Sequence, residues 1–192
     1  AFDFRVFAMI DEYLGVLRRL GAAVPDGYAE AVADAGRVRA ALDARPVPSV
    51  PCHCDPLCEN FLDDGGRMWV VDWEYSGNND PMWDLGDLSV EAGFDAAQDA
   101  ALLAAYFDGD PPAAMFGRMV MYKALCDLLW TLWGLIQHAN ANPADDFWAY
   151  ALGRFDRCRR LMANADFGQH LAAGARGGRR SPIRRSSWTA AC

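Results

Sequence analysis

The chain lacks the features that mark a secreted, membrane-spanning or repetitive protein. Its most apolar run, Ala124 to Ile136, is interrupted by Asp127 and is too short to span a bilayer. We recognise no secretory segment before the six cysteines and no internal repeat, and a chain of 192 residues that is 53% hydrophobic does not depend on a disulfide framework. The sequence therefore predicts one globular unit with its own core, in a reducing, cytoplasmic setting and with no membrane segment.

Basic residues are scarce in most of the chain. All 26 acidic residues lie at or before Asp166, whereas five of the 18 basic residues follow it. The part up to Asp166 therefore carries 13 basic and 26 acidic residues, a formal charge of −13. Such a surface repels nucleic acid and suits cationic ligands or divalent metal ions. We expect no nucleic-acid partner.

Helical periodicity dominates the remaining pattern. Apolar residues recur at helical spacing from Phe4 to Leu17, and the same spacing predicts helices at about 28–44, 80–94, 113–139 and 145–162. Between the second and third of these, "FLDD", "GG" and "RMWVVDW" are typical of two short strands joined by a tight turn at Asp63 to Gly66. The predicted fold is mainly α, an α+β arrangement with one small β hairpin.

The end of the chain has a different composition. From about Asp166 onward, "GQHLAAGARGGRRSPIRRSSWTAAC" offers Gly, Ser and Arg but no apolar periodicity. We expect a folded unit over residues 1–165 and a basic tail over 166–192 that is disordered or loosely attached. A basic tail can bind anionic partners, although a solvated terminus is the simpler interpretation of this composition.

The stretch "CHCDPLC" raises the first candidate site, because it holds four residues that bind soft metals: Cys52, His53, Cys54 and Cys58. A structural zinc site usually needs a second ligand pair at similar spacing. The other cysteines within the predicted helices stand alone in apolar surroundings, where free cysteine is a common core residue. Zinc is therefore the weaker of two interpretations of this stretch.

The stronger interpretation uses His53, Asp55 and Asn60, spaced as HxDxxxxN, followed by Asp72 after an apolar strand. Phosphoryl transfer needs a carboxylate that accepts the hydroxyl proton of the substrate, and oxygen ligands that hold Mg²⁺ against the phosphates. An Asp on a loop can face the substrate while an Asn five residues later turns toward the metal. After the hairpin, the next Asp returns to the same edge. The pattern predicts a phosphotransferase.

With these motifs the chain resembles the C-terminal lobe of the choline and ethanolamine kinases, within the protein-kinase-like group that includes the aminoglycoside phosphotransferases. "CHCDPLCENFL" is similar to the family's catalytic loop and "VVDWEYSGNNDPMWDLGDLSVE" to its metal-binding segment, carried by the hairpin. "LLWTLWGLIQ" and "YALGRFDR" resemble its substrate-side helices and favour choline kinases over the aminoglycoside enzymes. The resemblance covers roughly residues 1–162. It implies ATP and Mg²⁺ as cofactors and phosphorylation of the hydroxyl of a small cationic alcohol.

The resemblance also implies roles for individual residues near the catalytic loop. Asp55 is expected to be the catalytic base, and Asn60 and Asp72 the Mg²⁺ ligands. Glu74 is a candidate support for the metal site. Two residues are expected to organise the loop: His53 by packing and hydrogen bonding, and Asp84 by bracing it. Asp87, three residues after Asp84, is expected to be exposed.

A second set of residues is expected to bind the substrate. Trp130 and Trp133 are three residues apart on a predicted helix, so that one face presents both indoles. Taken alone, such an aromatic stripe usually belongs to the core. The resemblance matches Trp130, Trp133 and Tyr150 to an aromatic box that encloses a quaternary ammonium, and Glu91 to an acidic residue on its rim.

One part of such a kinase is missing from the sequence. The nucleotide site needs a small N-terminal lobe with a phosphate-covering loop and a strand lysine. The chain has a single lysine, Lys123, within a predicted helix, and no glycine-rich strand-turn-strand before His53. We therefore expect the N-terminal lobe to be absent from this chain. Three possibilities stay open: a choline- or ethanolamine-type kinase whose other lobe lies outside it, an aminoglycoside- or thiamine-type kinase, and a non-catalytic remnant of the fold.

Overall fold

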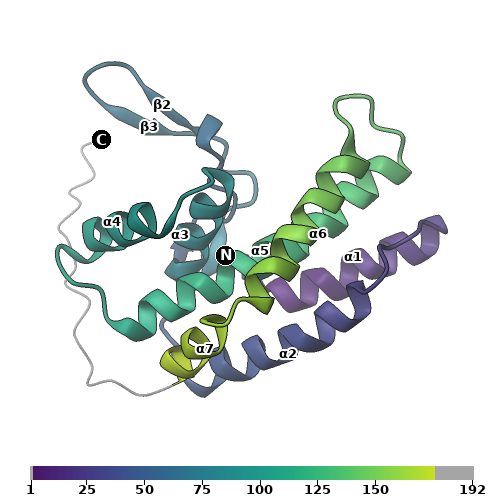
Figure 1. Cartoon of the computed structure of the whole chain (residues 1–192). Helices are drawn as coiled ribbons and strands as arrows, with labels where there is room; N and C mark the ends of the chain where they lie inside the picture. The colour runs from purple at the N-terminus through teal and green to yellow at the C-terminus, as the bar shows by residue number, and fades with distance from the viewer. Residues whose placement is uncertain (1, 176–192) are drawn as a thin grey trace.

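The protein is mainly helical, with two small antiparallel sheets near one end (Figure 1). The structure is a computed structural model that describes residues 2–175. In chain order the elements are α1 (Val6–Leu20), α2 (Tyr28–Ala44), β1 (Val50–Cys52), the 3-10 helix η1 (Cys58–Asn60), β2 (Phe61–Asp63), β3 (Met68–Val70), β4 (Gly77–Asn79), α3 (Pro81–Glu91), α4 (Ala96–Phe107), α5 (Ala113–Ala139), α6 (Phe147–Ala163) and α7 (Phe167–Ala175). The predicted helices and hairpin are all present, which confirms the predicted fold class; α4 and the β1–β4 pair were not predicted.

The long helix α5 forms the centre of the molecule, and α1, α3, α6 and α7 pack around it (Figure 1). By length and composition alone α5 is apolar enough to cross a membrane, but 83% of its most apolar window is buried inside the protein. It therefore has neighbours on nearly every side, which is typical of the core helix of a globular fold. This helix positions the predicted substrate-side residues.

Helix α3 begins where its sequence favours a start. Asp80 is the N-cap, and its Oδ1 accepts a hydrogen bond from Met82 N at 3.0 Å. Pro81 follows at the first helical position, where its missing N–H has no partner to lose. The other carboxylate oxygen of Asp80 binds Arg118 Nε at 2.8 Å and the Tyr122 hydroxyl at 3.1 Å, both from α5. This buried contact fixes the start of α3 against α5.

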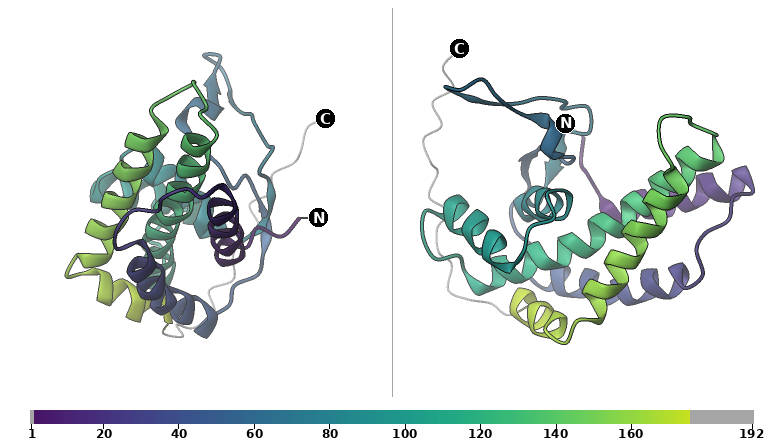
Figure 2. Two further views of the ribbon diagram at one scale, coloured as in Figure 1. Left: turned by 90° about the vertical axis from the view of Figure 1, so that its right-hand side faces the viewer. Right: turned by 45° about the horizontal axis from the view of Figure 1, so that its top comes forward.

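The two sheets differ in their surroundings. β1 pairs with β4, and Phe4 N donates to Asn78 O at 3.0 Å, so the chain start runs beside β4. β2 pairs with β3 in the predicted hairpin, which projects away from the helices (Figure 2). Most of its apolar side chains and those that follow it are exposed: Leu62, Met68, Trp69, Val70, Val71 and Trp73.

The expectation of an unstructured tail from Asp166 is wrong for its first part, because α7 occupies Phe167–Ala175. Phe167 is buried and the helix packs against α5. The two backbones approach closely at Gly117, where a Cβ would lie 2.6 Å from His170 O. Glycine at this position permits the contact, and an alanine- and glycine-rich segment can therefore pack as a helix without an obvious apolar stripe. Residues 176–192 of the predicted tail lie outside the described residues.

Candidate active site

The catalytic loop is held to α3 through its backbone. Asp84 accepts hydrogen bonds from His53 N at 2.7 Å and from Cys54 N at 2.9 Å. Trp83 adds a bond from its Nε1 to Cys54 O at 3.0 Å. Cys54 has a φ of 70°, in the left-handed region that favours glycine, so the loop turns sharply there. These contacts fix the backbone immediately before Asp55.

His53 ties the loop to the end of the hairpin. Its Nε2 lies 2.8 Å from Val71 O, and its ring packs against Trp73 with centroids 4.7 Å apart. The side chain is buried. His53 therefore sits where a loop-organising residue was expected, behind the loop and between two structural elements.

The Asp55 carboxyl is partly buried and lies among other charges. Burial, followed by the nearby negative charge of Glu91, raises the pKa of Asp55 to about 6, while His53 and Arg154 oppose that shift. The charge of Asp72 also acts to raise the pKa. Asp55 is thus within electrostatic reach of both the predicted metal ligand after the hairpin and the predicted acid on α3.

Hydrogen bonds connect Asn60 to Asp55, and the residue before Asp72 to Asn60. Asn60 is buried, and its Nδ2 donates to Asp55 O at 3.1 Å, which leaves the amide oxygen available as a ligand. Val71 N donates to Asn60 O at 3.0 Å, so the residue before Asp72 is bonded to Asn60. Asp72 itself is exposed, with φ 65°.

These donors fit a Mg²⁺ ion of the kind that phosphotransferases use. Mg²⁺ binds through one or two protein oxygens together with water and phosphate oxygens, rather than in an all-protein cage. Within residues 2–175 no group of three or more His, Cys, Asp or Glu side chains is placed to hold a metal by itself. Asn60 and Asp72 offer one amide oxygen and one carboxylate. Glu74 is exposed two residues later, and its supporting role stays a prediction.

Three of the four candidate zinc ligands, Cys52, His53 and Cys54, contact different backbone carbonyl oxygens. Cys52 Sγ lies 3.7 Å from Asn79 O, and Cys54 Sγ lies 3.9 Å from Gly77 O. Burial raises the pKa of the Cys54 thiol to about 12 and that of Cys52 further still, so neither is a ready thiolate. Cys58 is exposed. The arrangement favours the phosphoryl-transfer interpretation over zinc.

The predicted substrate residues Trp130, Trp133 and Tyr150 form one aromatic cluster between α5 and α6. The ring centroids of Trp130 and Trp133 are 6.4 Å apart, and those of Trp133 and Tyr150 are 5.9 Å apart. Two further members of this cluster were not predicted from the sequence. Tyr75, three residues after Asp72, lies 5.4 Å from Trp130, and Phe147 lies 5.5 Å from Trp133.

The cluster and the catalytic loop lie within electrostatic reach of each other. The charge of Asp55 acts on the phenols of both Tyr75 and Tyr150, although burial is the main reason that the pKa of each is raised. Tyr75 lies three residues after Asp72, within the stretch that resembles the metal-binding segment, so its position in "DWEY" was the available sequence signal. Tyr75 thus connects the metal edge to the aromatic cluster.

Glu91, the acid on α3 that was expected on the rim of the box, is ion-paired in the structure. Glu91 Oε1 contacts Arg154 Nη2, and the Arg154 side chain is only 5% exposed. The guanidinium also binds Asp127 and lies over the Tyr150 ring, with Cζ 4.8 Å from the centroid. Arg154 and Asp127 were missed because the sequence does not show which charged side chains meet.

Asp87 also departs from expectation, because it is fully buried rather than exposed. Burial, followed by the charge of Glu91, raises the pKa of Asp87 well above its usual value. It lies one helical turn before Glu91, on the α3 face toward α5.

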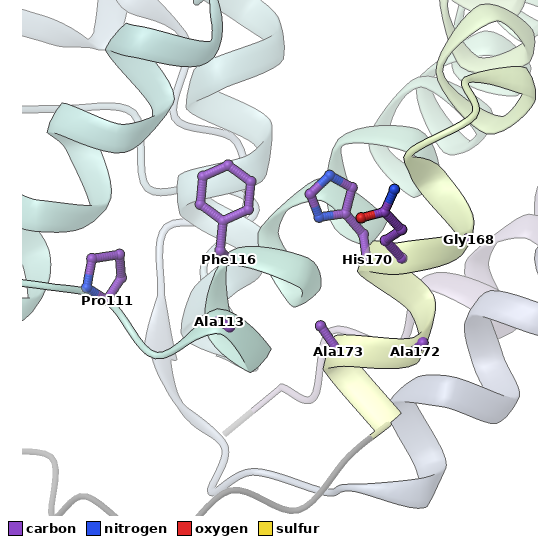
Figure 3. Close-up of a pocket in the computed structure, with 8 residues that line it drawn as sticks. Pro111, Ala113, Phe116, Gly168, His170, Ala172 and Ala173 are labelled. Atoms are coloured by element: carbon purple, nitrogen blue, oxygen red, sulfur yellow. The ribbon is translucent and has the colours of Figure 1, made fainter.

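A separate hollow of about 670 Å³ lies at the other end of the molecule, between the start of α5 and α7 (Figure 3). Phe116 and His170 stack beside it, with ring centroids 5.4 Å apart. Its lining contains no carboxylate. The catalytic loop, the hairpin and the aromatic cluster do not contribute to it.

Comparison with known proteins agrees with this geometry. The phosphotransferase enzyme family matches residues 6–115, which is more than half of the chain and includes the catalytic loop, the hairpin and α3. The chain belongs to the phosphotransferase enzyme family. The resemblance inferred from the motifs is confirmed, and the helices α5 and α6 that carry the aromatic cluster lie mostly beyond the matched range.

Individual phosphotransferases are similar to the chain over part of their length. The crystal structure of a choline/ethanolamine kinase family protein from Mesorhizobium loti matches 92% of this chain and 61% of the Mesorhizobium chain. The two share 62% sequence identity, and the TM-score is 0.87. Protein LicA of Haemophilus influenzae Rd is 30% identical over 118 residues, which are 58% of this chain and 43% of LicA. Mouse ethanolamine kinase 2 is 28% identical over 130 residues, 57% of this chain and 34% of the kinase.

The chain therefore spans 61% of the Mesorhizobium loti protein and less than half of the other two relatives. The part that the chain shares with these relatives is helical and kinase-like.

Proposed function

We propose that the chain is the substrate- and metal-binding lobe of an ATP-dependent kinase that phosphorylates the hydroxyl of a small cationic alcohol of the choline or ethanolamine type. One observation carries the proposal: Asp55 lies within electrostatic reach of Asp72, of Glu91 and of the two cluster residues Tyr75 and Tyr150. Asp55 would thus serve both the predicted metal ligands, where the phosphates would bind, and the aromatic cluster, which suits a cation.

In this proposal Asp55 accepts the proton of the substrate hydroxyl as its oxygen attacks the terminal phosphoryl group. Asp84 supports that role by fixing the two backbone N–H groups before Asp55. Asn60 and Asp72 would hold Mg²⁺, which neutralises phosphate charge when bound. The aromatic cluster would orient the cationic end so that the hydroxyl faces Asp55.

The remaining part of the nucleotide site would come from an N-terminal lobe. Support for this comes from the length of the relatives and from the hairpin, which exposes a row of apolar side chains that includes Trp69 and Trp73. An exposed apolar patch of this kind is typical of an interface. We propose that this face of the hairpin contacts the N-terminal lobe.

Calorimetric titration of the chain with choline tests the substrate half of the proposal without the missing lobe. Choline should bind, and the variants Trp130→Leu and Trp133→Leu should weaken binding about tenfold or more, because each removes a ring that can face the cation. Trp148→Leu is the matched control, since Trp148 lies on α6 but packs against His138.

A separate titration with ATP and Mg²⁺ helps to distinguish a substrate-binding lobe of a kinase from a non-catalytic remnant of the fold. Choline binding with weak or no nucleotide binding would fit a substrate lobe that awaits its partner. Failure to bind choline would contradict the proposal and leave the non-catalytic remnant as the better description.

A further inference from the structure

Four charged groups beside the aromatic cluster are paired with one another. Arg154 bridges Glu91 of α3 and Asp127 of α5, with Nη1 3.2 Å from Asp127 Oδ1. Arg157 also binds Asp127, with Nε–Oδ2 at 2.7 Å and Nη2–Oδ1 at 2.6 Å. Two carboxylates and two guanidinium groups therefore balance, and this group of residues adds no net charge for a cationic ligand.

Arg154 has also taken the contacts that a ligand ammonium group would use. Its guanidinium holds an oxygen of Glu91, an acid whose charge acts on Asp55, and covers one face of Tyr150. The side chain is nearly fully buried between three helices. Burial opposes its charge, but Tyr150, Glu91 and Asp127 hold the pKa of Arg154 above its ordinary value, so it stays a cation.

The rings that remain suit a cation without N–H groups. The ring of Trp130 is nearly perpendicular to the rings of Tyr75 and Trp133, with interplanar angles of 81° and 89°. An indole N–H can donate but cannot accept a hydrogen bond. A primary ammonium brings three donors and a large hydration cost, whereas a trimethylammonium needs only ring faces.

We propose that Arg154 sets the substrate preference of this site, by occupying Glu91 so that a quaternary ammonium alcohol is preferred over a primary one. Arg154 is a specificity-determining residue that acts through Glu91 and Tyr150, and choline-type alcohols are the substrate class. This inference rests on the proposed function, because it assumes that the aromatic cluster binds the cationic end of the substrate.

The test is calorimetric titration of the chain with choline and with ethanolamine. The wild-type chain should bind choline about tenfold or more tightly than ethanolamine. Arg154→Met frees the carboxylate of Glu91 for the primary ammonium, so the preference should fall to about twofold or less. Arg157→Met is the matched control, because Arg157 binds Asp127 without contacting Glu91, and it should keep the wild-type preference.

Two further variants keep the result interpretable if Arg154→Met does not fold. Arg154→Lys retains the charge and should retain the preference. Glu91→Gln retains an oxygen for Arg154 and should weaken both ligands without changing their ratio. A selective loss of ethanolamine binding in Glu91→Gln would overturn the inference, because the acid would then be serving the ligand directly.

The outcomes for the wild-type chain separate the two proposals. Equal binding of the two alcohols, or a preference for ethanolamine, would overturn the role of Arg154 and leave the proposed function intact. Binding of neither alcohol would overturn both. An unchanged preference in a folded Arg154→Met variant would overturn the role of Arg154 alone.

Discussion

The catalytic loop and the aromatic cluster with its paired charges are built in opposite ways, although they meet at Asp55. The loop is one short segment, held by its own backbone to Asp84 and, through His53, to the end of the hairpin. The aromatic cluster is assembled from distant segments, and its central ion pair joins residues 63 positions apart. The loop should therefore tolerate changes of chemistry without unfolding, whereas changes to the buried charges should alter stability and binding together.

Asp55→Asn should have the largest effect on activity and almost none on stability. In any form of the protein that turns over, loss of the base should lower kcat by about 10²- to 10⁴-fold. The shape of the side chain is unchanged, so the thermal midpoint should stay close to that of the wild type. Glu59→Gln, on the same loop but exposed, should keep full activity. Steady-state kinetics that show normal turnover in Asp55→Asn would remove this residue from the base role.

Asp127→Ala should have the largest effect on stability. It leaves Arg154 buried with one fewer partner and removes the partner of Arg157, which should cost about 3–5 kcal/mol in the free energy of unfolding. The control is Asp34→Ala, which removes an exposed ion pair with Arg37 and should cost about 0–1 kcal/mol. Urea unfolding monitored by tryptophan fluorescence measures both. Equal losses in the two variants would show that the buried network does not stabilise the fold.

Asp84→Ala should have an intermediate, local effect. Two backbone N–H groups of the loop lose their acceptor, at a cost of about 1–3 kcal/mol for each donor left unsatisfied. Amide hydrogen exchange should accelerate at His53 and Cys54 while the amides of α5 remain protected. Exchange that accelerates uniformly across the chain would mean that Asp84 supports the whole fold rather than the loop.

Leu62→Ala on the hairpin should have the smallest effect. Leu62 is 50% exposed, so its truncation should change the free energy of unfolding by about 0.5 kcal/mol or less. Leu132→Ala on α5 makes the same chemical change at a fully buried position and should cost about 2–5 kcal/mol. Denaturant unfolding of the pair measures the contrast. A large loss in Leu62→Ala would show that the hairpin is part of the core of this chain.

The same contrast explains what could be predicted from the sequence. The predicted catalytic-loop and metal residues lie within 20 positions of one another: His53, Asp55, Asn60 and Asp72. Their spacing and the strand between them can therefore be recognised in the sequence. The two glycines of the hairpin turn also indicated its place, although the turn is centred on Gly65 and Gly66, one residue later than predicted. Apolar periodicity predicted the helices at the centre of the fold, because burial and period coincide there.

Long-range pairing of charges could not be predicted in this way. Arg154 was visible within "YALGRFDR", but no spacing rule indicates that it meets Glu91 and Asp127 rather than solvent. The burial of Asp87 depends in the same way on α5 covering α3. Helix α7 was missed because its contact with α5 depends on the close approach at Gly117 rather than on a stripe of large apolar residues.

The most direct test of the account is nuclear magnetic resonance of the labelled chain during titration with choline. We predict that the indole N–H signals of Trp130 and Trp133 and the carboxyl signal of Asp55 shift together and give one dissociation constant, while the signal of Trp148 does not move. Shifts confined to the indoles, with Asp55 unchanged, would show that the aromatic cluster binds the cation without presenting its hydroxyl to the proposed base. That result would contradict a single site.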